Sequence, residues 1–395
     1  MAEETRYSGV VSSPRRLGVR SPNWLGDAVM SFPAVQRLHE AYPDSELVIV
    51  TRAHLAGLWT RVPGVSKVVS LDRESGLLAS ARKIRQEGLD AYLLFPSSMR
   101  TALEGWIGGA KRRIGYGSYV RRRLLTQVVP KTEAYRQMHK RSKAEIRLLR
   151  QAFSLGDRSS DAVKTRPYLL ENHHVHHYLR LAASLGANER PMVPALEHSE
   201  GECWRVFERL VGERTEGSLL IGLNAGAEYG PAKRWPLERY GEVAGLLEAK
   251  QSVRWLLFGG PGDVERCESL RGLLVSTGCQ RVVTVAGKTS LIEASMLFRL
   301  MDVVITNDTG PMHLAAASGT RVVAIFGSTS PELTGPGLPG ESARVKVVAA
   351  DIPCRPCFRR ECPVGLECLT SVSAQRVARE VREFIEKGPA SKGVE

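Results

Sequence analysis

The chain contains no long run of apolar residues. Although 43% of its 395 residues are hydrophobic, no apolar stretch approaches the roughly 20 residues that a helix needs to cross a bilayer. The first residues, Met-Ala-Glu-Glu-Thr-Arg-Tyr, also lack the basic segment followed by an apolar segment that is typical of a secretory signal. These absences predict a cytoplasmic protein, and the length predicts two domains of roughly 150 to 200 residues each.

Cysteine is scarce and odd in number, so a disulfide framework is not expected. Of the seven cysteines, three stand alone in the sequence: Cys203, Cys267 and Cys279. The other four follow one another at short spacing: Cys354, Cys357, Cys362 and Cys368. This spacing resembles a small knuckle in which four thiolates bind a structural zinc ion. Four reduced thiols in a lid-like loop are the alternative, and no metal is expected at a catalytic centre.

Acidic residues are fewer than basic ones. The chain has 55 Lys and Arg against 42 Asp and Glu, a formal net charge of +13, so its partners are expected to be anionic. Nucleic acid, an acidic membrane surface and a phosphorylated substrate all meet this condition. The charge gathers in residues 111–123, which hold six basic residues and no acidic one, and in residues 131–150. The aromatic and glycine residues inside the first run indicate a shaped binding loop, and a solvated face is the alternative.

Apolar β-branched runs alternate with amphipathic segments along the chain. In the first half, strands are predicted at residues 17–20, 47–51, 65–71 and 91–95, and helices at residues 28–42, 74–87 and 98–109. In the second half, strands are predicted at residues 219–223, 253–258, 282–285, 303–306, 322–326 and 345–349, with a closing helix at residues 374–387. This alternation predicts an α/β protein with two doubly wound, Rossmann-like domains that face each other across a cleft.

The domain boundary is predicted in a charged, histidine-bearing stretch, where Pro191 and Pro194 mark a linker. The expected parts are an N-terminal domain at 14–185, a C-terminal domain at 186–372, a final helix at 373–387, and loose tails at 1–13 and 388–395. His173 and His177 are four residues apart, as in some metal sites. No carboxylate or cysteine is suitably placed beside them, so a solvated helix is favoured.

A carboxylate lies in the first strand-to-helix loop, where Gly26 and Asp27 precede the predicted helix. A helix N-terminus favours the charged form of an acid. At the mouth of a cleft, Asp27 could act as a general base toward a hydroxyl group. A plain helix cap is the alternative.

Loops of the second half are suited to a nucleotide. Residues 224–237 combine small residues with Lys233, which could neutralise charge on a departing phosphate. Asp308 or Thr309 could cap a helix that begins at Pro311, and the N–H groups at such a helix start bind anions, although an ordinary capped turn also fits. Asp263 ends a glycine-rich loop placed to meet ribose hydroxyls. That loop lacks the spacing of a dinucleotide fingerprint, which argues against a dehydrogenase.

Five ordered segments resemble glycosyltransferase family 9, the lipopolysaccharide heptosyltransferases, and most closely its heptosyltransferase II branch. They are PNWLGDAVMSFP at 22–33, RIGY at 113–116, KRWP at 233–236, LFGGPGD at 257–263 and NDTGPMHLA at 307–315. The resemblance covers about residues 15–385. It implies the GT-B arrangement, with the acceptor on the N-terminal domain and the nucleotide sugar on the C-terminal one. It also implies transfer of heptose from ADP-heptose to the inner core of lipopolysaccharide, with inversion and with no required cofactor or metal.

The resemblance also implies roles for individual residues. Asp27 would be the general base and Lys233 the diphosphate contact, which makes these two the catalytic residues. The donor-binding residues would be Asn224, Lys233, Asp263, Asp308, Thr309, Gly310 and His313. The residues expected to bind the acidic acceptor are Asn23, Arg100, Lys111, Arg112, Arg113, Arg121, Arg122 and Arg123.

The expected partners are therefore a nucleotide sugar and an acidic lipopolysaccharide core precursor at the inner membrane. The chain is expected to be a monomer that associates peripherally with the cytoplasmic face of that membrane. One alternative is a member of the same family with another donor sugar or acceptor position, resembling heptosyltransferase I or III. From another class, a basic nucleic-acid-binding protein is the alternative, but the sequence shows no recognisable reading helix, finger or RNA-binding motif.

Overall fold

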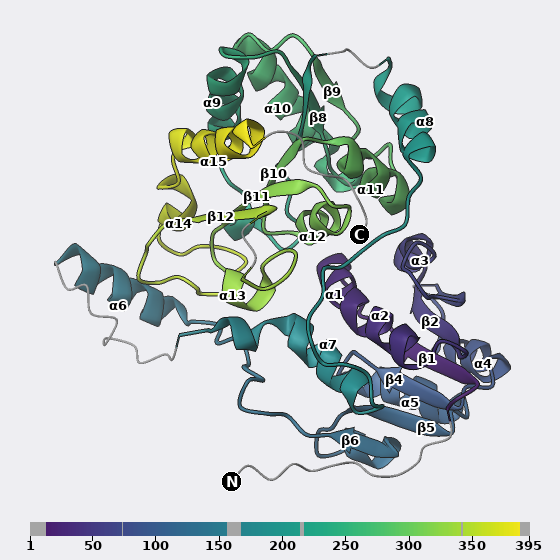
Figure 1. The fold of residues 1–395 in the computed structure, drawn as a ribbon. Helices are drawn as coiled ribbons and strands as arrows, with labels where there is room; N and C mark the ends of the chain where they lie inside the picture. The colour runs from purple at the N-terminus through teal and green to yellow at the C-terminus, as the bar shows by residue number, and fades with distance from the viewer. Residues whose placement is uncertain (1–12, 73, 156–166, 214–216, 341–342, 388–395) are drawn as a thin grey trace.

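The protein is built from two α/β halves, each with a six-stranded parallel sheet (Figure 1). The structure, a computed structural model, describes residues 13–72, 74–155, 167–213, 217–340 and 343–387. Apart from Ser13, the tails predicted at residues 1–13 and 388–395 lie outside the described residues. Within the described part of the chain, no helix is both long enough and apolar enough to cross a membrane.

The first sheet has the strand order β3-β2-β1-β4-β5-β6. Its strands are β1 (Arg16–Arg20), β2 (Glu46–Arg52), β3 (Lys67–Leu71), β4 (Ala91–Leu94), β5 (Arg112–Tyr116) and β6 (Gln127–Val129). Its helices are α1 (Leu25–Met30), α2 (Phe32–Ala41), α3 (Ala53–Trp59), α4 (Leu77–Gln86), α5 (Met99–Ile107) and α7 (His174–Ala183). Successive side chains of β2 enter opposite cores, Ile49 with α2 and α7, and Val48 with α4 and α5. Both faces are therefore covered, as a parallel sheet requires.

The second sheet has the order β12-β11-β10-β7-β8-β9. Its strands are β7 (Leu219–Asn224), β8 (Val253–Leu257), β9 (Val282–Thr284), β10 (Val303–Asn307), β11 (Arg321–Phe326) and β12 (Val345–Ala349). Its helices are α8 (Glu200–Val211), α9 (Leu237–Glu248), α10 (Val264–Ser276), α11 (Leu291–Leu300), α12 (Gly310–Ala317), α13 (Pro331–Thr334), α14 (Glu367–Thr370) and α15 (Ala374–Glu386). In each sheet the strand order reverses once, between β1 and β4 and between β7 and β10. Loops that leave the carboxyl ends of strands at such points form ligand sites.

The predicted strands are all present, within a few residues of their expected bounds. The single helix predicted at residues 28–42 is wrong, because the chain forms two helices that meet at Ser31. The Ser31 hydroxyl donates to the carbonyl oxygen of Ala28 at 2.7 Å, and Pro33 starts the next helix. The sequence did not predict strands β5 and β6, nor the helices α3, α6 (Lys143–Ser154), α8, α11, α13 and α14.

The two halves touch where α1 and α12 begin. A Cβ atom on Gly26 would lie 2.9 Å from Cδ2 of His313, and one on Gly310 would lie 2.8 Å from Cβ of Leu25. Both glycines therefore permit an approach that any side chain would block. The contact brings the loop that follows β1 against the loop that follows β10.

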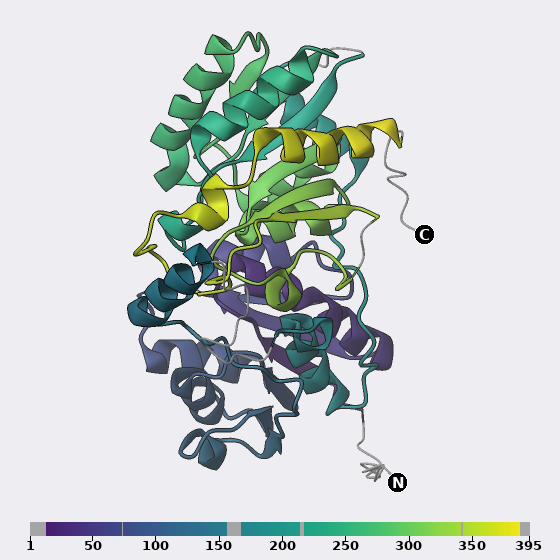
Figure 2. The same cartoon turned by 90° about the vertical axis from the view of Figure 1, so that its left-hand side faces the viewer.

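Helix α6 extends from the first half to the second (Figure 2). Its Ile146 and Leu149 pack with Cys354 and Cys357 of the second half. The backbone N–H of Arg141, just before this helix, donates to the carbonyl oxygen of Cys357 at 3.1 Å. This segment therefore ties the two halves together on the side away from α3.

Helix α7 is not the solvated helix that was predicted for the histidine-rich stretch. Its Leu179 and Ala182 are fully buried, and it packs on α2. His173, at its start, is 1% exposed, and its Nε2 lies 3.0 Å from the carbonyl oxygen of Gly335. The prediction failed because an alternation of histidines with apolar residues does not show which face of a helix is buried.

Candidate active site

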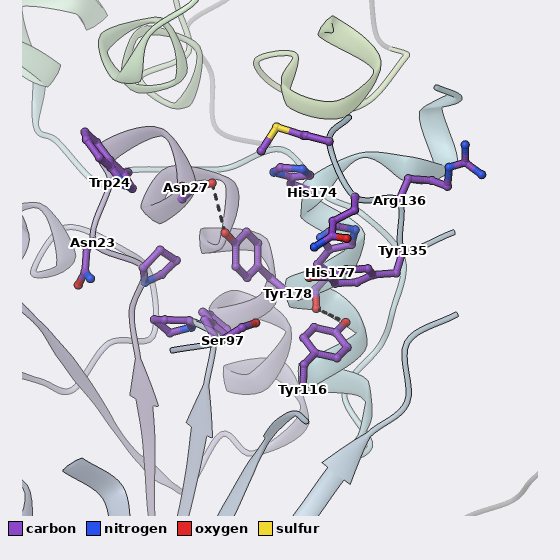
Figure 3. A pocket seen from close by; sticks show the side chains of 15 residues that line it. Asn23, Trp24, Asp27, Ser97, Tyr116, Tyr135, Arg136, His174, His177 and Tyr178 are labelled. Carbon is purple, nitrogen blue, oxygen red and sulfur yellow. Dashed lines mark hydrogen bonds between the residues drawn. The ribbon is translucent and has the colours of Figure 1, made fainter. Parts of the chain in front are cut away.

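A cavity of about 320 Å³ opens beside Asp27 (Figure 3). Its floor comes from the carboxyl ends of three neighbouring strands, with Asn23 and Trp24 after β1, Phe95 and Ser97 after β4, and Tyr116 at the end of β5. Its wall comes from residues that lie far away in the sequence: Tyr135, Arg136, His174, His177 and Tyr178. The cavity is thus a strand-end site, lined mainly by aromatic rings and imidazoles, with one carboxylate.

Asp27 lies in the first turn of α1, where a helix dipole favours negative charge. The Tyr178 hydroxyl donates to its Oδ1 at 3.4 Å. Burial raises the pKa of the Asp27 carboxyl above its usual range, while the nearby charges of His174 and Lys233 and the Tyr178 hydrogen bond oppose this rise. A carboxylate with a raised pKa is a stronger base than one in water.

An ion pair between Lys233 and Asp308 lies on the opposite side, in the second half. Lys233 Nζ is 2.6 Å from Asp308 Oδ2, and the two side chains are only 14% and 2% exposed. The Thr329 hydroxyl donates to the same carboxylate oxygen. The aromatic ring of Tyr229 supports the ammonium group, whose nitrogen lies 5.0 Å from the ring centre. Lys233 is therefore held rigidly, in a place from which its charge also acts on Asp27.

The start of α12 is open for an anion. Thr309 occupies the N-cap position, as one of the two predicted caps, but no side chain makes the capping hydrogen bond. The Thr309 hydroxyl instead accepts from the Asn224 amide at 3.0 Å. The prediction of a capped turn is wrong in this respect. Pro311 has no N–H, and the N–H of Met312 donates to the carbonyl oxygen of Thr309 at 3.1 Å, so among the described residues the N–H groups of Thr309 and Gly310 are the ones left for another acceptor.

Asn307 holds together the loops that follow β7 and β10, and its role was not predicted from the sequence. Its amide nitrogen donates to the carbonyl oxygens of Ala225 and Gly226 at 2.8 and 3.2 Å, and its Oδ1 accepts from the N–H of Trp235 at 3.1 Å. Asn224 is fixed in the same way by Thr306, at 2.9 Å. The sequence signal for these roles was the presence of an amide side chain at the end of each of two adjacent buried strands, β7 and β10.

Asp263 and His313 lie at the same edge. The Asp263 carboxylate accepts from the N–H of Gly260 at 3.1 Å, and a Cβ on Gly226 would come within 2.5 Å of its Oδ1. It therefore faces the loop that follows β7. His313 is 5% exposed, and burial lowers its pKa to about 4, so its ring is neutral at physiological pH. It packs against Gly26 and bridges the Asp27 loop and the start of α12.

The loop that contains the four clustered cysteines supports the Lys233 segment. The N–H groups of Cys357 and Phe358 donate to the carbonyl oxygen of Ser328, at 3.0 and 2.7 Å. The Tyr229 hydroxyl donates to the carbonyl oxygen of Phe358 at 2.8 Å. All four cysteines are free, and burial raises the pKa of Cys354 to about 11. Across the residues that the structure describes, no three His, Cys, Asp or Glu side chains are grouped to hold a metal ion.

The predicted acceptor cations do not form one surface. Arg121 is 1% exposed, and its guanidinium donates to the carbonyl oxygens of Ser98 at 3.2 Å and Pro96 at 2.9 Å. It holds the β4–α5 loop under the cavity, so its assignment as an exposed acceptor contact needs correction. Arg122 and Arg123 remain exposed beside it.

Most of the other predicted acceptor residues lie outside the cavity, and Lys111 and Arg112 stand at the amino end of β5, opposite to it. Arg113 donates to the carbonyl oxygen of Leu124 at 2.8 Å, and Lys111 pairs with Asp90 at 2.8 Å. Further internal bonds run from Arg112 to Gln127 at 3.2 Å, from Arg100 to Glu104 at 2.9 Å, and from Arg20 to Asn23 at 3.3 Å. Of this set, only Asn23 lines the cavity.

Residues of the cavity wall were missed by the sequence analysis. His174, His177 and Tyr178 share one face of α7, since they are spaced three and four residues apart. Tyr135 reaches the same cavity from the segment that follows β6. The spacing shows that these side chains share one face of α7. Whether that face meets a cavity or solvent depends on how the helix packs.

The fold has two Rossmann-like halves. One carries a carboxylate with a raised pKa, Asp27, and the other carries Lys233 near the N-terminus of α12. This arrangement is that of the GT-B class of glycosyltransferases. The pattern shared by glycosyltransferase family 9 (heptosyltransferase) matches residues 77–367. The chain belongs to this family, and the prediction of a glycosyltransferase is confirmed.

Relatives and solved structures agree with this assignment. Lipooligosaccharide heptosyltransferase 2 of Haemophilus influenzae is 28% identical over 339 residues, which are 84% of this chain and 88% of the relative. Lipopolysaccharide heptosyltransferase 2 of Escherichia coli is 29% identical over 328 residues, which are 80% of this chain and 84% of the relative. The solved structure of E. coli ADP-heptose LPS heptosyltransferase II is similar with a TM-score of 0.73 at 24% identity, covering 94% of this chain and 99% of that one. This likeness confirms the GT-B fold.

Proposed function

We propose that the protein transfers heptose from ADP-heptose to the inner core of lipopolysaccharide, in the manner of a heptosyltransferase II. The observation that carries the proposal is the contact of α1 with α12, which brings the segment of Asp27 against the loop of Asp308, the ion-pair partner of Lys233. Asp27 as the base for the acceptor and Lys233 as the cation for the leaving diphosphate are thus proposed to act on the same reaction. The names of the relatives supply the sugar and the acceptor.

The reaction is a single displacement. Asp27 accepts the proton of the acceptor hydroxyl, whose oxygen attacks the anomeric carbon of the heptose. The bond between that carbon and the diphosphate oxygen breaks, and ADP departs with the electron pair. The single attack inverts the anomeric centre. Lys233 and the N–H groups at the start of α12 stabilise the negative charge that grows on the diphosphate.

The donor lies on the second half in this proposal. Thr309 and Gly310 contact the phosphates. Asp308 accepts hydrogen bonds from hydroxyl groups of the heptose while it remains paired with Lys233. The remaining donor residues are proposed to act at the edges of the site: Asn224 and His313 by fixing its loops, and Asp263 by accepting from ribose hydroxyls. Lys233 is the cation that faces the diphosphate in this proposal, and no cofactor is assigned.

The acceptor is proposed to enter over the first half. The exposed Arg122 and Arg123 attract an acidic core precursor at the cytoplasmic face of the inner membrane. Peripheral association with that membrane, a monomeric state and the division into domains at 14–185 and 186–372 belong to the same proposal. The nucleic-acid alternative has no support, because the chain belongs to a glycosyltransferase family.

The proposal is tested by offering the protein several nucleotide sugars and defined core acceptors and weighing the products. The proposal is supported if an acceptor that already bears one heptose gains the mass of a second heptose, and if this happens only with ADP-heptose as donor. Transfer of another sugar, or transfer to an acceptor that lacks the first heptose, favours the alternative within the same family.

The acid side of the pH–activity profile should lie at higher pH than the usual range of an aspartate. Asp27 acts only when deprotonated, and burial raises its pKa. Replacing Tyr178 with Phe removes a hydrogen bond that lowers this pKa, so the acid limb of kcat/KM should move further up in pH. A profile that keeps its position in the variant would contradict the role of that hydrogen bond.

The basic run should separate into two kinds of residue on mutation. Replacing both Arg122 and Arg123 with Gln should raise the acceptor KM and flatten its dependence on salt, because exposed cations act through a screened field. Arg121→Gln should instead lower the melting temperature, because it removes hydrogen bonds to buried carbonyl oxygens. Steady-state kinetics gives the acceptor KM of both variants, and thermal unfolding gives their melting temperatures. The reverse pattern would contradict the assignment.

A further inference from the structure

The ring of His177 has a buried nitrogen without a partner. Its Nε2 is shielded from solvent and makes no hydrogen bond within the described residues. The same residue lines the cavity that contains Asp27. A polar atom is seldom buried without a partner, so this nitrogen of a cavity-lining residue is left to bond a ligand.

The position of this ring is fixed on both sides. The Tyr135 ring stacks on it with centres 4.2 Å apart and planes inclined by 21°, and the His174 ring lies 5.0 Å away. The backbone carbonyl of His177 accepts from the Tyr116 hydroxyl at 2.8 Å, which fixes this turn of α7 (Figure 3). The nitrogen therefore cannot easily turn to find a protein partner.

The chemistry of the cavity favours an uncharged sugar over an anionic group. Burial, with the nearby charges of His174, His176 and Lys131, lowers the pKa of His177 to about 3, so its imidazole is neutral at physiological pH. A neutral imidazole pairs well with a hydroxyl, as donor or acceptor. Rings of Trp24, Tyr116 and Tyr135 line the same space and offer apolar faces to the C–H groups of a sugar. Arg136 extends away from the centre of the cavity in Figure 3.

We propose that His177 is a specificity-determining residue that hydrogen-bonds a hydroxyl of the acceptor sugar whose neighbouring hydroxyl attacks. The inference rests on the proposed function and deepens it. The acceptor ring lies among the aromatic side chains, His177 fixes its rotation, and the attacking hydroxyl thereby points at Asp27. The exposed arginines attract the acidic acceptor, whereas His177 orients it.

The test compares His177→Phe with wild-type protein. Phe keeps the stacking with Tyr135 and removes the nitrogen, so the acceptor KM should rise by about 10- to 100-fold, the effect of losing one buried hydrogen bond. The donor KM and ADP affinity should stay within about twofold, because both belong to the other half. His177→Gln, which returns an amide nitrogen, should recover part of the loss. The matched control is His176→Phe, at the next position of α7 and outside the cavity lining, which should behave as wild type.

A set of acceptors that each lack one hydroxyl completes the test. One deoxy acceptor should bind wild-type protein about as weakly as the full acceptor binds His177→Phe. When that deoxy acceptor is offered to His177→Phe, no further loss of affinity is expected. An unchanged acceptor KM in His177→Phe, or fully additive losses with every deoxy acceptor, would overturn the inference. Should wild type transfer no heptose, the proposed function fails. Calorimetry of acceptor binding without donor then decides the His177 contact by the same comparison.

Discussion

Replacing Asp27 with Asn is expected to lower kcat by about 10²- to 10⁴-fold, the usual contribution of a general base. The amide has nearly the shape of the carboxylate and can still meet the Tyr178 hydroxyl, but it cannot accept the proton of the acceptor hydroxyl. ADP affinity should change by less than about threefold, because the diphosphate site lies in the second half. Steady-state kinetics with calorimetry of ADP binding measures both quantities.

The control for this variant is Asn23→Ala, which changes another polar residue of the same loop and cavity without touching the base. It should alter the acceptor KM more than kcat. Turnover of Asp27→Asn near the wild-type level would reduce Asp27 to a residue that shapes the start of α1. An equal loss of ADP affinity would indicate that the contact of α1 with α12 had been disturbed.

Replacing Lys233 with Ala should weaken ADP binding by roughly 1.5–3 kcal/mol, the range for a hydrogen bond to a charged group. The structure adds a second consequence. Asp308 is 2% exposed and pairs with Lys233, so the substitution leaves a buried carboxylate with Thr329 as a remaining donor. The free energy of unfolding should fall by about 3 kcal/mol, near the lower end of the range for a broken buried ion pair.

A double variant separates these two consequences. Adding Asp308→Asn to Lys233→Ala removes the unpaired charge, so much of the lost stability should return while ADP binding stays weak. Calorimetry and denaturant unfolding on the wild type and the two variants provide the comparison. Wild-type ADP affinity in Lys233→Ala would exclude a contact between this lysine and the diphosphate.

The central strands were predictable because they are buried on both faces and consist largely of apolar residues. Strand β5 was missed for the opposite reason: it begins with Arg112 and Arg113, which resemble a surface charge run. The break between α1 and α2 depends on Ser31 bonding to a backbone carbonyl, which a periodic pattern does not reveal.

The site was only partly predictable. Asp27, Lys233 and Asp308 follow strand ends, and the family segments that contain them suggest their roles. The aromatic wall could not be foreseen, because His177 and Tyr178 enter it only after α7 folds back onto the first sheet. Arg121 shows the same limit, since burial turns an apparent surface cation into a support for backbone carbonyls.

The configuration of the new glycosidic bond tests the central claim most directly. ADP-heptose of known anomeric configuration is incubated with a defined inner-core acceptor, and the anomeric centre of the product is determined by NMR. A single displacement, with Asp27 as base and ADP as leaving group, predicts inversion. A product with retained configuration would contradict this account.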